Sequence, residues 1–340
     1  MAMERNRVIV VDDSAFMRMI ISEMIESTGR YNVVARLKNG KELIENIEKY
    51  NPDIITLDVE MPIMDGLTTL KELKKRNKKY SIIMLSSLTK KGSVTTMQCL
   101  EAGAVDFVEK ATGSNRENMK TELINKIDGI LENQVVSKAT VVHKNIEIKG
   151  HKKIDAVVVG ASTGGPRALQ QMLSKIDGDI DVPIFVVQHM PKGFTKAFAD
   201  RLDKICNLKV VEAEDGMCIE SNTIYIAQGG YHMTVGDGKR IKLNEEPAIW
   251  GVRPAVDKLF ESAVKVYGGK LVSAILTGMG RDGATGCELV KNAGGVTISE
   301  DQSTCTIYGM PKAAYETGKI DLVLPLQEIG DNINRIIKGR

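Results

Sequence analysis

Short apolar runs rich in Val and Ile recur along the first part of the chain, and an amphipathic segment follows most of them. Such runs are typical of strands buried on both faces of a parallel sheet, and the amphipathic segments predict helices that cover it. Ser14 precedes the first amphipathic segment and is a good helix N-cap. The predicted strands are residues 8–11, 33–37, 53–58, 81–86 and 104–109. This alternation predicts an N-terminal doubly wound, flavodoxin-like α/β domain.

Polar residues stand at the carboxyl ends of these runs. Asp12 and Asp13 follow the first run, and Asp58 closes the third. Ser86 closes the fourth, and Lys110 follows the fifth. Because the carboxyl ends of parallel strands share one edge, we expect these side chains to converge. Each acid alone is as typical of a helix cap or a loop, but clustered carboxylates repel one another unless a cation joins them, and their hard oxygens suit Mg²⁺.

The pattern of strands and helices resumes after residue 153. The predicted strands are residues 154–159, 183–191, 223–227, 271–277, 295–298 and 322–324, with a helix at 194–205 and a hairpin formed by 233–235 and 240–243. These elements predict a second doubly wound, mainly parallel α/β domain that carries a β-hairpin.

A serine stands in the turn that follows the run 154–159. The segment from Gly160 to Gly164 matches G-x-S-x-G, which lifts a serine hydroxyl out of a strand–turn–helix bend, and Ser162 is its serine. Two alternatives remain open: Ser162 caps the next helix, or the glycine-rich turn binds the pyrophosphate of a dinucleotide. Against the dinucleotide, the spacing is not G-x-G-x-x-G, and the next strand ends in Gln188 and His189 instead of a ribose-binding acid.

A serine nucleophile needs a base, and the base needs a group that orients it. His189 is the best base because it ends the strand predicted beside that of Ser162, and Asp282 follows a later buried strand. His232 is the rival base, or else lines the substrate pocket. Taken singly, His189 fits a side chain satisfied by a backbone carbonyl and Asp282 fits an Asx-turn. Together they predict a hydrolytic C-terminal domain, with a backbone amide in 278–280 well placed as an oxyanion hole.

The length, charge and composition of the chain limit the classes of protein to which it can belong. The chain has 340 residues, enough for two domains, and a net charge of +2, which gives no reason to expect nucleic-acid binding. Apolar runs are too short to insert in a membrane, and the N-terminus does not resemble a signal peptide. The five cysteines include no C-x-x-C pair, as expected of reduced, cytoplasmic thiols.

Residues 132–153, with His143 and His151, predict a linker between domains 1–131 and 154–340.

Residues 7–131 resemble a response-regulator receiver domain. The matching pieces are residues 11–14, residues 57–66, the Ser86 position and Lys110. The resemblance implies that Asp58 accepts a phosphoryl group and that Lys110 binds the phosphoryl oxygens. It also implies Ser86 and Phe107 as the two switch residues. The implied Mg²⁺ ligands are Asp12, Asp13, Asp58 and the backbone carbonyl of Glu60.

Nearly the whole chain resembles the chemotaxis protein-glutamate methylesterase/glutamine deamidase family. Motifs 160–165, 188–191 and 278–283 carry the resemblance, together with 253–260 and 307–311. It implies a phosphorylation-activated hydrolase that demethylates glutamate methyl esters and deamidates glutamines on chemoreceptors, with a histidine kinase as phosphodonor and no cofactor for hydrolysis. Ser162 would be the nucleophile, His189 the base and Asp282 its orienting group, and the Met279 N–H would stabilise the oxyanion. The receiver would cover the active-site edge until Asp58 is phosphorylated.

Two other classes of function compete with this interpretation. In the first, the chain is a response regulator whose C-terminal domain only binds a partner; the near-neutral charge and lack of a basic helix count against a nucleic-acid partner. In the second, it is a dinucleotide-dependent oxidoreductase, against which the Gln188–His189 strand end counts.

Overall fold

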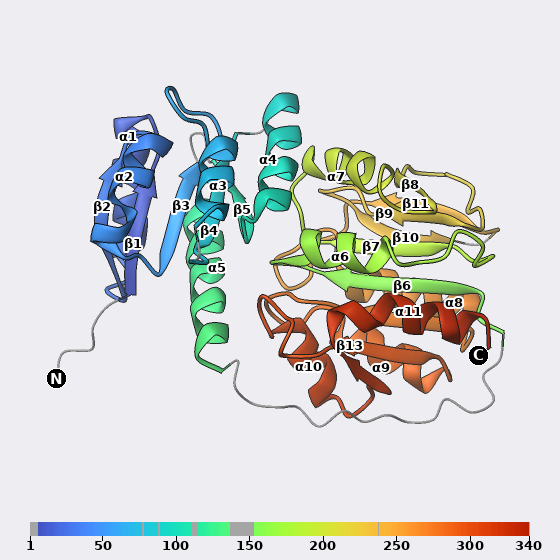
Figure 1. Cartoon of the computed structure of the whole chain (residues 1–340). Coiled ribbons are helices and arrows are strands. Elements are labelled where there is room, and N and C mark those ends of the chain that lie inside the picture. The colour runs from blue at the N-terminus through green and yellow to red at the C-terminus, as the bar shows by residue number, and fades with distance from the viewer. Residues whose placement is uncertain are drawn as a thin grey trace. The chain divides into compact units, whose positions relative to one another are not determined.

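The computed structural model describes residues 6–76, 78–87, 89–110, 115–136, 153–236 and 238–339. The chain separates into two compact units, Met1–Leu131 and Glu132–Arg340. Figure 1 shows both units, with most of their helices and strands labelled. Over the described residues, no helix combines the length and the apolar character needed to cross a membrane.

The first unit is a five-stranded parallel sheet covered by helices. Its strands are β1 (Asn6–Val11), β2 (Tyr31–Leu37), β3 (Ile54–Asp58), β4 (Ser81–Ser86) and β5 (Asp106–Glu109). Its helices are α1 (Ala15–Glu26), α2 (Gly40–Tyr50), α3 (Gly66–Lys74), α4 (Lys90–Ala102) and α5 (Arg116–Val136). The strand order is β2-β1-β3-β4-β5, and every pair is parallel. The predicted doubly wound, flavodoxin-like sheet is confirmed.

Side-chain caps fix where the helices of this unit begin. Ser14, Asn39, Asp65 and Thr89 each accept a backbone N–H in the first turn of α1, α2, α3 and α4, respectively. The Ser14 cap agrees with the sequence prediction. Helices α2, α3 and α4 pack side by side. The chain moves from β1 to β2 in one direction and from β2 to β3 in the other, so right-handed crossovers place α1 on the opposite face from α2.

The second unit is built on a seven-stranded parallel sheet. Its sheet strands are β6 (Ala156–Ala161), β7 (Ile184–Gln188), β8 (Lys209–Glu212), β9 (Thr223–Ile226), β12 (Leu271–Ile275), β13 (Val296–Glu300) and β14 (Leu322–Leu324). The antiparallel hairpin is β10 (His232–Gly236) and β11 (Arg240–Asn244). Its helices are α6 (Gly165–Leu173), α7 (Phe194–Leu202), α8 (Val256–Tyr267), α9 (Ala284–Asn292), α10 (Met310–Glu316) and α11 (Leu326–Ile337). The predicted mainly parallel α/β fold with a hairpin is confirmed.

Strand β6 is the centre of this second sheet. The order is β14-β13-β12-β6-β7-β9-β8, so β6 pairs with β7 on one side and with β12 on the other. Every residue of β6 is buried, which accounts for its unbroken apolar sequence. The strand order reverses at β6, and ligands of open α/β sheets bind beyond the carboxyl ends of the strands at such a point. The turns after β6, β7 and β12 therefore meet at the predicted binding edge.

Some boundaries differ from the sequence prediction. Helix α5 continues to Val136, so residues 132–136 are helical instead of the start of the predicted linker. Helix α7 ends at Leu202, before the predicted end at residue 205. Strand β8 and helices α9, α10 and α11 were not predicted individually. The rest of the predicted linker up to residue 152, with His143 and His151, lies outside the described residues.

Candidate functional site

Ser162 is the first residue after the central strand β6. Helix α6 begins beyond it: its N-cap is Gly164, in the left-handed region with a φ of 77°, and no side chain caps this helix. The hydroxyl of Ser162 therefore does not cap α6, and that alternative from the sequence is wrong. Ser162 is half-buried, and its backbone N–H donates to the carbonyl of Thr277 over 3.0 Å. The turn holds the serine beyond the sheet edge, where its hydroxyl is not used for capping.

Gln188 ties the end of β7 to the serine turn. Its side-chain amide nitrogen donates to the carbonyls of Ser162 and His189, each over 3.0 Å, and the residue is almost fully buried. The amide approaches α6 closely: a Cβ on Gly165 would lie 2.0 Å from the Gln188 oxygen. Glycine at this position therefore leaves the space that Gln188 needs. The sequence interpretation used Gln188 as evidence against a dinucleotide and as part of a family motif, and it missed this contact.

His189 follows β7 and lies beside the serine turn. Ala161 pairs with Gln188 across the sheet, and the His189 backbone N–H donates to the Ala161 carbonyl over 3.1 Å. Ser162 and His189 are therefore each the first residue beyond one of two paired strands, β6 and β7. The His189 ring Nε2 lies 2.8 Å from Asp282 Oδ2. A hydrogen on Nε2 satisfies this bond and leaves Nδ1 as the ring nitrogen that can accept a proton.

Asp282 is buried behind this histidine, at the N-terminus of α8. Its Oδ2 also accepts the backbone N–H of Val256 over 2.6 Å, and its Oδ1 accepts that of Asp257 over 2.9 Å. Burial acts to raise the pKa of this carboxyl, but the hydrogen bond from His189 and the two backbone donors outweigh it and lower the pKa. Asp282 is thus held as a carboxylate, as a group that orients an imidazole requires.

The loop after β12 lies against the serine. A Cβ on Gly278 would lie 2.8 Å from the Cβ of Ser162, so only glycine allows this approach. The Gly278 carbonyl accepts the backbone N–H groups of Gly309 and Met310, which fixes the peptide that follows it. Within the described chain, the Met279 backbone N–H donates to no protein acceptor. A fixed and unused backbone N–H beside Ser162 suits an oxyanion hole.

Glu300 holds this loop in place through hydrogen bonds. It was not identified from the sequence as a residue that supports the site. It is fully buried at the end of β13 and accepts the backbone N–H of Thr277 over 2.7 Å and the hydroxyl of Thr304 over 2.9 Å. The Thr277 hydroxyl in turn donates to the carbonyl of Thr163 over 3.0 Å. Burial raises the pKa of Glu300 to about 7, against the lowering effect of its hydrogen-bond donors. Glu300 acts on the serine turn through Thr277.

His232, the rival base, has both ring nitrogens engaged by backbone groups. Nε2 lies 3.1 Å from the Pro247 carbonyl, and Nδ1 accepts the Ala255 backbone N–H over 3.2 Å. The ring is fully buried, and this burial lowers its pKa. His232 is therefore a neutral structural side chain that fixes the chain before α8, and neither alternative role predicted for it is supported.

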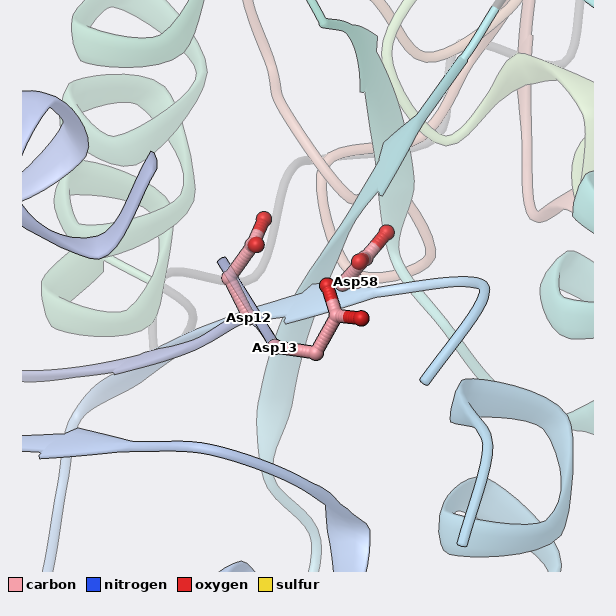
Figure 2. A group of neighbouring side chains, drawn as sticks. All are labelled: Asp12, Asp13 and Asp58. Atoms are coloured by element: carbon pink, nitrogen blue, oxygen red, sulfur yellow. The ribbon is translucent and has the colours of Figure 1, made fainter. Parts of the chain in front are cut away.

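The receiver-like unit gathers three carboxylates at the ends of β1 and β3. Ligand oxygens of Asp12, Asp13 and Asp58 lie within 4.8 Å of one another, and Figure 2 shows the three side chains at this edge. Asp12 and Asp58 are buried and Asp13 is exposed, so the cluster opens to solvent on one side. A set of carboxylate oxygens at this spacing fits a hard divalent cation such as Mg²⁺.

Lys110 completes the cluster. Its Nζ lies 2.7 Å from both Asp12 Oδ2 and Asp58 Oδ2. Burial raises the pKa of Asp58 to about 6, with the Lys110 ammonium acting in the opposite direction. For Lys110 itself burial acts to lower the pKa, but Asp58 and Asp12 outweigh it and raise the pKa.

The other predicted residues of this unit lie around the cluster or near it. The Ser86 hydroxyl is buried at the end of β4 and accepts that of Thr96 over 2.7 Å. Phe107 is buried in β5. The Glu60 backbone N–H lies 3.4 Å from Asp58 Oδ1, so Glu60 borders the cluster, whereas the role predicted for its carbonyl stays a prediction.

Comparison with known proteins identifies the family. Residues 157–333 match the family model of the CheB methylesterase, and residues 8–124 match that of the response regulator receiver domain. The protein-glutamate methylesterase/protein-glutamine glutaminase of Clostridium acetobutylicum is 48% identical over 343 residues, which cover 99% of each chain. The chain belongs to the CheB methylesterase family.

Further relatives agree with this assignment. The protein of the same description from Archaeoglobus fulgidus is 43% identical and covers 98% of each chain. The crystal structure of the Thermotoga maritima CheB methylesterase catalytic domain is 41% identical, with a TM-score of 0.53, and covers 54% of this chain and all of that one. The resemblance drawn from the sequence motifs is confirmed, and the oxidoreductase and non-catalytic interpretations find no support.

Proposed function

We propose that this member of the CheB methylesterase family hydrolyses glutamate methyl esters, and deamidates glutamines, with Ser162, His189 and Asp282 as its catalytic residues. The contact that carries the proposal is the 2.8 Å pair between His189 Nε2 and Asp282 Oδ2, formed beside the turn that exposes Ser162. His189 follows β7 and Asp282 lies in the loop after β12, the two strands adjacent to β6, and the N-terminus of α8 holds Asp282 in place.

The geometry supports a two-step acyl transfer. Ser162 Oγ attacks the side-chain carbonyl carbon while His189 Nδ1 takes the hydroxyl proton, and the Met279 N–H stabilises the oxyanion. The imidazolium then protonates the departing methoxy or amino group, which leaves as methanol or ammonia, and an acyl-enzyme ester remains on Ser162. Water attacks this ester with His189 again as base, which releases the glutamate carboxylate and the serine hydroxyl. Asp282 stabilises the imidazolium in both steps.

The receiver unit supplies the control in this proposal. Receiver domains are phosphorylated in a Mg²⁺-dependent manner, and here Asp58 would accept the phosphoryl group from a histidine kinase. Asp12, Asp13 and Asp58, with the Glu60 carbonyl, would hold Mg²⁺. The bound cation would offset the negative charge of the incoming phosphoryl group. Lys110 would pair with the phosphoryl oxygens, and Ser86 and Phe107 would respond to them as switch residues.

The test is methanol release from membranes that carry methylated chemoreceptors, the proposed substrate. We expect release by the wild-type chain to increase with a small phosphodonor and Mg²⁺. Ser162→Ala should abolish release, Asp58→Asn should abolish only the increase, and Ser221→Ala, at an exposed serine, should match the wild type. Undiminished release by Ser162→Ala would contradict the serine mechanism.

A further inference from the structure

Trp250 is an exposed aromatic side chain on a strained backbone. It is the single tryptophan of the chain, 57% of it is exposed, and its φ is 54°, in the left-handed region that bulky residues rarely adopt. Trp250 and Gly251 form a two-residue turn closed by the paired backbone groups of Ile249 and Val252, and this turn holds the conformation and presents the indole ring. Trp250 lies in the segment between the hairpin and α8. This segment leads to the N-terminus of α8, where a backbone N–H group binds Asp282.

Two contacts fix the indole ring, one to the loop that carries Asp282 and one to the first turn of α8. The Arg281 guanidinium stacks over the ring, with its carbon 5.0 Å from the ring centroid. The indole N–H donates to Asp257 Oδ2 over 3.3 Å. The other oxygen of Asp257 accepts the backbone N–H groups of Gly283 and Gly286 over 3.0 and 2.7 Å. The ring is therefore preorganised beside the proposed catalytic carboxylate without being covered.

Trp250, Arg281 and Met279 form what we name the recognition patch. Met279, which would supply the oxyanion N–H, is itself 37% exposed, and Arg281 is exposed next to Asp282. Among the described residues, Arg281 has no carboxylate partner within ion-pair distance. An arginine stacked on an aromatic face keeps its N–H edges free to bind a carboxylate in two hydrogen bonds. The patch thus offers apolar area and an unpaired positive charge at the rim of the site.

We propose that the recognition patch binds a polypeptide segment that carries carboxylates close to the reacting glutamyl ester, with Arg281 pairing with a carboxylate and Trp250 packing on the adjoining aliphatic chain. The inference rests on the proposed function and adds the features by which the substrate is selected. Charge complementarity argues for this occupant, because each completed turnover leaves a glutamate carboxylate on the segment. A neutral apolar segment would use Trp250 and leave the Arg281 charge without a partner.

The first test measures binding through the emission of Trp250, since no other tryptophan contributes. Full-length Ser162→Ala protein, with phosphodonor and Mg²⁺, is titrated with two helix-forming peptides. Each carries one glutamate methyl ester, flanked by glutamates in the first peptide and by alanines in the second. We expect a saturable change in emission and binding of the acidic peptide about tenfold or more tighter. Arg281→Gln should abolish this preference, and Arg335→Gln, at an exposed arginine on α11, should retain it.

The second test measures methanol release from the same peptides by the active chain. Trp250→Ala should raise the KM for the acidic peptide more than it lowers kcat, Trp250→Phe should restore most of the loss, and Leu289→Ala, an exposed apolar residue on α9, should have no effect. Equal use of both peptides by the wild-type chain, with no change in emission on binding, would overturn the recognition patch alone. Absence of methanol release from either peptide by the active chain would instead overturn the proposed function.

Discussion

The side-chain nitrogen of Gln188 lies 3.0 Å from the backbone carbonyl oxygen of Ser162. The same nitrogen donates to the carbonyl of His189, so one buried amide joins the residues proposed as nucleophile and base. Such positioning matters because a displacement of about 1 Å at reacting groups costs about 10²-fold in rate. The sheet brings the two residues near one another, and Gln188 fixes their separation.

Replacement of Gln188 by alanine should therefore impair catalysis beyond its effect on stability. Two buried carbonyls lose their donor, which costs roughly 1–3 kcal/mol of unfolding free energy. We expect kcat for methanol release to fall about 10²-fold with little change in KM. Gln171→Ala, at an exposed glutamine on α6, is the matched control. A Gln188→Ala protein with the wild-type kcat would show that the sheet alone suffices.

Asp282→Asn should show how much of the effect of the proposed orienting residue on kcat comes from its charge and how much from its shape. Asparagine nearly preserves the volume of the side chain but cannot stabilise an imidazolium or hold the Nε2–H tautomer of His189 by charge. We expect kcat to fall by about 10²–10⁴ while the fold persists. Asp321→Asn, which changes another buried acid of the same unit, just before β14, should leave kcat unchanged. Steady-state methanol release by both variants makes the comparison.

Glu300 should make the stability of the catalytic unit depend on pH. Its pKa is about 7 in the folded chain against 4.5 as the ordinary value, so between these values the folded state binds more protons than the unfolded state. The contribution of Glu300 to the unfolding free energy therefore falls as the pH rises through this window and is constant above it. A shift of this size corresponds to about 3 kcal/mol.

Glu300→Gln keeps an oxygen that can accept the Thr277 N–H but cannot ionise. Relative to the wild type, this variant should gain about 3 kcal/mol of stability between about pH 4.5 and pH 8. Urea unfolding followed by Trp250 emission reports on the catalytic unit, because the single tryptophan lies in it. An unchanged difference between the two proteins across this pH range would show that Glu300 does not titrate there.

Lys110→Met should change how the acidic cluster binds a cation. Lys110 places a positive charge 2.7 Å from two of the three carboxylates, where it repels a divalent ion. Its removal should tighten Mg²⁺ binding several-fold, measured by calorimetry, and slow phosphorylation of Asp58 by a small phosphodonor. Lys38→Met, at an exposed lysine, should change neither property. Weaker Mg²⁺ binding by Lys110→Met would contradict this account of the cluster.

The positions of the proposed catalytic residues were predictable because they depend on where apolar runs end. Ser162, His189 and Asp282 each follow a buried parallel strand, and parallel strands bring their carboxyl ends to one edge. The same rule predicted the convergence of Asp12, Asp13 and Asp58, which the structure shows.

The supporting contacts were not predictable, because they join residues far apart in the sequence. Glu300 reaches Thr277 across adjacent strands, and no local pattern marks a buried acid as the acceptor of a particular backbone N–H. The hydrogen bonds of the His232 ring to backbone groups of Pro247 and Ala255 were not predictable for the same reason. Helix α11 is different: Leu326, Ile329 and Ile333 share its buried face, so the signal was present in the sequence and was overlooked.

The acyl-enzyme tests the central claim most directly. The full-length chain, with phosphodonor and Mg²⁺, is mixed with a peptide that carries one glutamate methyl ester, quenched with acid within the first turnover and digested for mass spectrometry. The account predicts that the fragment containing Ser162 gains the mass of the peptide less methanol, and that Ser162→Ala shows no such adduct. Methanol release without this adduct, or an adduct on another residue, would contradict Ser162 as the nucleophile.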